Sequence, residues 1–109
     1  MKTVKISMNE VDKERLEKYF TVTWNALEEA KKSPENIDID SETRRHFIEN
    51  VERYLKDAEY FEKRGEFVDA FAALNYAHGL LDGGVLIGVF DVENDELFAF
   101  VKSKQSSKS

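Results

Sequence analysis

The sequence contains no cysteine among its 109 residues. Structural disulfides, thiol catalysis and cysteine-ligated zinc are therefore excluded. Acidic residues outnumber basic ones by 22 to 16, which argues against general binding of nucleic acid or of an anionic membrane. No apolar run approaches the ~20 residues that span a bilayer, and the N-terminal residues lack a signal-peptide core. We therefore expect a cytoplasmic protein that binds neither nucleic acid nor membrane.

Proline is almost absent, and its single occurrence marks a boundary between two helical segments. Apolar residues recur at alternating spacings of four and three along residues 9–32, with Asn9 as a suitable N-cap. Ser33-Pro34 ends this segment, because the residue before a proline is pushed out of helical conformation. The same spacing returns along residues 41–64, with Asp40 or Ser41 as the N-cap. Both patterns predict helices that turn one face to a core.

A third helix is predicted over residues 67–87, after a tight turn at Gly65 and before Gly88 as the C-terminal residue in left-handed conformation. Three core-facing helices with short connections predict an all-α, up-down-up three-helix bundle. We expect residues 1–104 to form one domain. The 1–8 and 92–104 segments alternate enough to be short extended or β-like segments, and whether they pair is open. The tail at 105–109 is expected to be disordered.

A stripe of polar residues interrupts the otherwise apolar third helix. Asn75, His78 and Asp82 fall within an arc of about 60°, nearly opposite the main apolar face. Small residues on that apolar face allow close approach of neighbouring helices. The face collects Ala70, Ala73, Leu74, Ala77, Leu80, Leu81 and Gly84. A mixed outer face of this kind normally meets another surface.

Three interpretations of the stripe are open, and the structural one is favoured. In the structural interpretation, the stripe is bonded locally or to the backbone of the C-terminal segment, with Phe98 and Phe100 covering the helix. In the second, it forms a contact between two copies of the chain. In the third, it is a metal or catalytic site; however, His78 and Asp82 supply only two ligands, so a third would have to come from elsewhere. No catalytic constellation, metal site or cofactor is predicted.

For function, we expect a non-catalytic protein-interaction or self-association module, acting as a homodimer or with a protein partner. Its interface residues would be Phe71, Leu86 and Val89, which flank the polar stripe. The alternative is a small-ligand or metal-binding protein. Its ligand-binding residues would be Asn75, His78 and Asp82, together with Tyr76.

The third helix also carries a recognisable motif. Residues 73–84 read ALNYAHGLLDGG, residues 87–91 read IGVFD, and the preceding turn at 60–70 reads YFEKRGEFVDA. Together they resemble an archaeal family of unknown function, domain-of-unknown-function family 357, over roughly Glu14 to Asp91. The resemblance implies a three-helix bundle from an archaeal cytosol; the family has no assigned activity, so no functional role carries over. The high content of lysine and glutamate, with a single glutamine, is in addition typical of thermophilic proteins.

Overall fold

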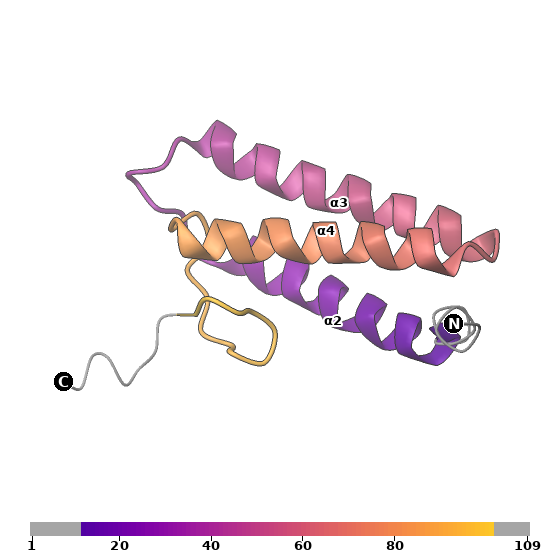
Figure 1. The fold of residues 1–109 in the computed structure, drawn as a ribbon. Helices are drawn as coiled ribbons and strands as arrows, with labels where there is room; N and C mark the ends of the chain where they lie inside the picture. Colours follow the sequence, from indigo (N-terminus) through magenta and orange to yellow (C-terminus); the bar gives the residue numbers. More distant parts are fainter. Residues whose placement is uncertain (1–11, 102–109) are drawn as a thin grey trace.

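The computed structural model describes residues 12–101 of the chain. Within this range the protein consists of helices α2 (Asp12–Lys32), α3 (Ser41–Lys63) and α4 (Phe67–Leu86), and it contains no strand. Successive helices run in opposite directions, with α4 lying between α2 and α3 in the view of Figure 1. The predicted all-α, up-down-up bundle is confirmed. The expected N-cap at Asn9, and residues 1–8, lie outside the described residues.

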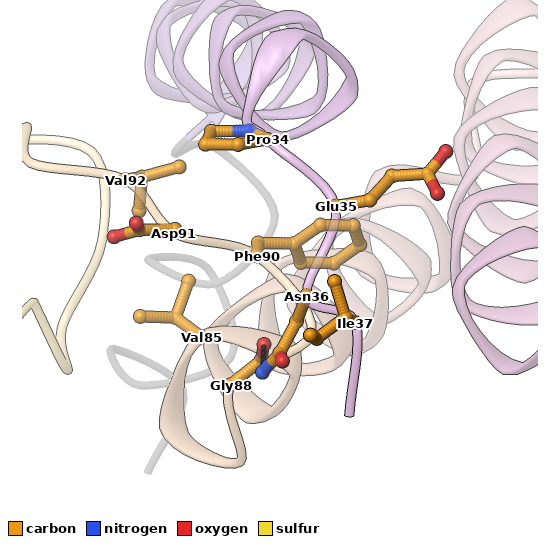
Figure 2. Close-up of a pocket in the computed structure, with 9 residues that line it drawn as sticks. All are labelled: Pro34, Glu35, Asn36, Ile37, Val85, Gly88, Phe90, Asp91 and Val92. Atoms are coloured by element: carbon orange, nitrogen blue, oxygen red, sulfur yellow. Dashed lines mark hydrogen bonds between the residues drawn. The ribbon is translucent and has the colours of Figure 1, made fainter. Parts of the chain in front are cut away.

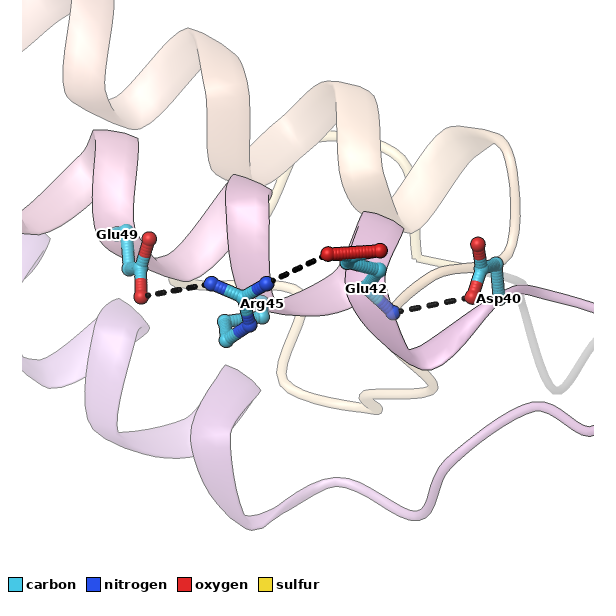
Figure 3. Close-up of polar contacts among 4 residues, drawn as sticks. All are labelled: Asp40, Glu42, Arg45 and Glu49. Atoms are coloured by element: carbon cyan, nitrogen blue, oxygen red, sulfur yellow. Dashed lines mark hydrogen bonds and ion pairs between the residues drawn. The ribbon is translucent and has the colours of Figure 1, made fainter.

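The α2–α3 connection follows the signals at its two ends. Ser33 closes α2, since its backbone N–H and its hydroxyl both donate to the Ala30 carbonyl. Asp40 is the N-cap of α3, and its carboxylate accepts from the backbone N–H of Glu42 at 3.2 Å. One turn later Arg45 forms ion pairs with Glu42 and Glu49 (Figure 3). These exposed pairs contribute only about 0.2–1 kcal/mol each, so the cap sets where α3 begins.

Glycines terminate both α3 and α4 by the same motif. Gly65 has φ +76° and Gly88 has φ +90°, a backbone region that other residues rarely adopt. After α3, the Glu66 N–H bonds the Phe61 carbonyl and the Gly65 N–H bonds the Glu62 carbonyl. The equivalent pair of bonds follows α4. Both ends are Schellman motifs, and the predicted ends at Gly65 and Gly88 are confirmed to within one residue.

The core forms around α4, whose small residues allow close packing on both neighbours. Gly84 shows how close this packing is: a Cβ at that position would lie 2.6 Å from the Phe90 ring. α4 packs extensively on α3 and less on α2, whereas α2 and α3 contact each other least. Buried residues come from all three helices and from the segment after α4. They are Leu16, Ala26, Leu27, Ala30, Val51, Leu55, Ala58, Ala70, Ala73, Leu74, Ala77, Leu81, Val89, Phe90, Val92 and Phe98.

The segment after α4 folds back over the bundle without forming a strand. It turns at Asn94, whose carbonyl accepts from the N–H groups of Leu97 and Phe98. The side chain of Asn94 also accepts from the Glu96 N–H at 2.9 Å. Phe98 is 3% exposed, whereas Phe100 is 48% exposed. The alternating pattern of this segment is typical of a strand, yet the described chain offers it no strand to pair with, and it packs on the bundle through buried side chains such as Phe98 instead.

Candidate functional site

His78 lies at the centre of the polar stripe and uses both ring nitrogens. Nε2 lies 2.8 Å from the Leu97 carbonyl oxygen, and Nδ1 lies 3.2 Å from the Thr23 hydroxyl. A carbonyl can only accept, so Nε2 carries the proton and donates it to Leu97. In the neutral ring, Nδ1 then accepts from Thr23, which is 2% exposed in α2. His78 thus joins α2, α4 and the C-terminal segment.

Asp82 binds the same segment one helical turn further along α4. Its Oδ1 accepts from the backbone N–H of Ala99 at 2.8 Å, and its Oδ2 lies 3.9 Å from His78 Nε2. Leu97 and Ala99 flank the buried Phe98, so the two polar side chains hold the backbone on either side of that ring. The stripe therefore meets the chain's own C-terminal segment, the arrangement expected from the structural interpretation. Phe98 takes part in that cover and the half-exposed Phe100 does not.

The other two candidate ligand-binding residues do not join this network equally. Asn75 is exposed, and its amide has no hydrogen bond within residues 12–101. It shares with His78 and Asp82 an open hollow of about 350 Å³ that Tyr19 and Glu96 also line. Tyr76 instead lies against Tyr54 of α3, with ring centroids 4.5 Å apart. The structure therefore brings Asn75, His78 and Asp82 together and places Tyr76 elsewhere.

The three candidate interface residues also differ in their surroundings. Phe71 is partly buried, with its ring edge-on to Tyr19 at 5.1 Å. Val89 is 1% exposed and belongs to the core. Leu86, at 62% exposed, presents most of its apolar side chain to solvent. Of the three, Leu86 alone lies mainly on the outer surface.

Leu86 is one of three exposed apolar residues at the end of α4 and in the adjacent loop, two of which the sequence analysis did not identify. Ile87 beside it is 57% exposed, and Ile37 in the α2–α3 loop is 94% exposed. The loop lies against the end of α4, because the Asn36 amide donates to the Gly88 carbonyl at 3.0 Å. We call Ile37, Leu86 and Ile87 the apolar end surface. The sequence feature that could have identified this surface is the run VLIGVF at residues 85–90, because its apolar residues continue beyond the end of α4 at Leu86.

The apolar end surface borders a hollow of about 380 Å³ between the α2–α3 loop and the segment after α4. Figure 2 shows Ile37, Asn36 and Gly88 close together at one side of it. Val85, Phe90 and Val92 supply apolar walls, and Pro34 contributes from the loop. Glu35 and Asp91 provide carboxylates at the same site. The hollow therefore combines apolar walls with polar groups, including an acidic margin formed by these two carboxylates.

Arg44 holds this end of the bundle together from α3. Its Nη2 donates to the carbonyls of Ala30, Lys31 and Ser33 at 2.9–3.3 Å, and its Nη1 donates to the Val89 carbonyl. The guanidinium also lies 5.5 Å from the Phe90 ring centroid. It contacts carbonyls at the end of α2, where the helix leaves its last carbonyls without i+4 N–H partners. Arg44 and the Asn36–Gly88 hydrogen bond therefore fix the frame beneath the apolar end surface.

Comparison with known proteins gives one family. Residues 18–90 match the family described as "Protein of unknown function (DUF357)". The chain belongs to this family. Its matched region contains the polar stripe and ends before Leu97 and Ala99, which bind that stripe here. No curated protein and no solved structure is significantly similar to the chain.

Within 12–101, no group of three or more histidine, cysteine, aspartate or glutamate side chains is placed to hold a metal ion. None of α2, α3 and α4 is both long and apolar enough to cross a membrane.

Proposed function

We propose that the protein is a non-catalytic interaction module that self-associates through the apolar end surface. The observation that carries this proposal is the exposure of Ile37, Leu86 and Ile87 at one end of the bundle, 94%, 62% and 57% respectively. Single exposed apolar residues are ordinary, whereas neighbouring ones at a fixed site are typical of interfaces. A second copy would remove all three side chains from water.

The frame under this surface supports the proposal. Ordering loops and side chains on binding costs free energy, and a surface that is already ordered avoids that cost. The Asn36–Gly88 hydrogen bond and the Arg44 contacts already hold the loop and the end of α4 together. The acidic margin also predicts how self-association depends on salt. Two copies that meet here bring Glu35 and Asp91 of each near the other, so added salt should strengthen self-association by screening their repulsion.

Sedimentation analysis of the full chain tests the proposal. We expect a concentration-dependent dimer whose dissociation constant falls as salt rises. Leu86→Glu should weaken the dimer at least tenfold, since it places a charge in an apolar contact. Val68→Glu is the matched control, because Val68 is 47% exposed at the opposite end of α4. A wild-type chain that stays monomeric at high concentration would count decisively against self-association.

A second candidate function is the binding of a small polar ligand at the stripe. It is favoured by the hollow beside Asn75, His78 and Asp82, which exposes the Asn75 amide to a ligand. Zinc, nickel and common nucleotides are suitable probes in a thermal unfolding assay. A ligand present at 100 times its dissociation constant stabilises the native state by about 2.7 kcal/mol. An unchanged melting temperature with every probe would exclude this candidate for those ligands.

A further inference from the structure

A groove lies between α2 and α3, away from the end of the bundle that carries the apolar end surface. These two helices contact each other less than either contacts α4, and the space between them forms an open hollow of about 530 Å³. We call it the α2–α3 groove. Seven residues line it, five from α2 and two from α3: Glu17, Phe20, Thr21, Trp24, Asn25, Glu59 and Glu62.

Two aromatic side chains give the groove its apolar surface. Phe20 and Trp24 are one helical turn apart on α2, about 6 Å along its axis. Both are partly buried and pack against the core, so neither is free to turn away. They form a short apolar strip of the kind that receives the apolar face of a partner helix, whose own side chains repeat every three or four residues.

The charges around this strip all have one sign. Glu17, Glu59 and Glu62 line the groove, and no lysine or arginine does. None of the three carboxylates takes part in an ion pair within residues 12–101. Towards the other end of α2 the helices are bridged instead, by Lys31 and Glu52 at 3.3 Å. The part of the groove that is open is therefore also the part whose lining carboxylates form no ion pair among the described residues.

We propose that the α2–α3 groove binds a basic amphipathic helix of a partner protein. Apolar side chains of that helix would lie on Phe20 and Trp24, and its lysines or arginines would face the carboxylates on both sides. A cation near the indole face of Trp24 would gain a cation–π contact as well. The acidic rim selects against nucleic acid and anionic lipid, and in favour of positively charged protein.

Trp24 reports on this groove directly, because it is the only tryptophan in the chain. The full chain is titrated with an 18-residue peptide of leucine and lysine, with leucines spaced to form one apolar helical face. We expect a saturable shift of the Trp24 emission to shorter wavelength and helix formation by the peptide. Affinity should fall as salt rises. A peptide of the same pattern with glutamate in place of lysine should not bind.

A matched pair of double variants separates the groove from general charge attraction. Glu59→Gln/Glu62→Gln removes two charges from the groove and should weaken binding about tenfold. Asp57→Asn/Glu93→Gln removes the same charge from exposed positions outside the groove and should change the affinity less than twofold. Urea unfolding curves verify that both variants are folded.

Three results would overturn the proposal. The two double variants could weaken binding equally, which would show attraction to the net charge alone. The peptide could bind without changing the Trp24 emission, which would place it elsewhere. It could also fail to bind a folded full-length chain, as it would if another segment of the chain already fills the groove.

Discussion

Replacing Phe98 by alanine tests whether the C-terminal segment is an integral part of the folded protein. Phe98 is 3% exposed, and a buried Phe→Ala change typically costs about 3–5 kcal/mol. The measured loss cannot exceed the free energy with which the segment itself is docked. That docking includes the Leu97 and Ala99 hydrogen bonds, the second to a carboxylate and worth about 1.5–3 kcal/mol. We therefore expect a loss of about 3 kcal/mol.

Two measurements check this prediction. Urea unfolding followed by circular dichroism gives the loss of global stability, because the signal comes from the three helices and not from the segment. Hydrogen exchange at the Ala99 amide reports local opening, since its bond to Asp82 exists only in the docked state. Phe100→Ala is the control: Phe100 is 48% exposed, and its loss should cost less than about 1 kcal/mol.

Two observations together would refute this reasoning: a loss of stability below about 1 kcal/mol for Phe98→Ala, and exchange of the wild-type Ala99 amide as fast as that of a free peptide. The segment would then be undocked for much of the time, and His78 and Asp82 would face solvent. The structural interpretation of the polar stripe would fail with it.

Three further predictions concern stability, each measured by urea unfolding. Gly84→Ala should lower the free energy of unfolding by about 1–3 kcal/mol, because its Cβ would overlap the Phe90 ring. Gly79→Ala should instead raise the free energy of unfolding by about 0.5–1 kcal/mol, because its Cβ would lie in open space. Equal effects would contradict the close approach at Gly84. Arg44→Lys should cost about 1–3 kcal/mol despite its retained charge, since lysine cannot reach the same carbonyls with a planar fork, and an unchanged midpoint would contradict this role. Thr23→Val should cost about 1–3 kcal/mol by leaving a ring nitrogen of His78 without its partner; a neutral or stabilising effect would show that water replaces the hydroxyl.

The helices could be predicted because their ends are specified locally. Gly65 and Gly88 adopt positive φ, and Asp40 caps the helix that follows it. Each of these signals depends on a few adjacent residues, so it can be read without knowing the rest of the fold. The apolar face of α4 was predictable for the same reason, since its spacing fixes which side chains share one side.

The partners of the polar stripe could not be predicted in the same way. His78 and Asp82 bind the backbone of Leu97 and Ala99, and every residue except proline carries the same backbone groups. No sequence pattern distinguishes the carbonyl that will be used. Thr23 has the same four-and-three spacing as the apolar residues that α2 turns to the core, yet its hydroxyl bonds His78. Spacing identified its face and gave no information about its partner.

The docked C-terminal segment also allows experiments to distinguish the proposed partner-binding surfaces from a ligand site at the polar stripe. The apolar end surface and the α2–α3 groove do not include His78 or Asp82, so partner binding at either leaves the stripe undisturbed. A ligand that bound these two side chains directly would instead compete with the Leu97 carbonyl and the Ala99 amide. Only molecules with an undocked segment could bind this ligand, so its apparent affinity would be proportional to the fraction of undocked molecules. Phe98→Ala should therefore strengthen such a ligand while leaving the groove peptide unaffected, and titrating both into the same variant distinguishes the two.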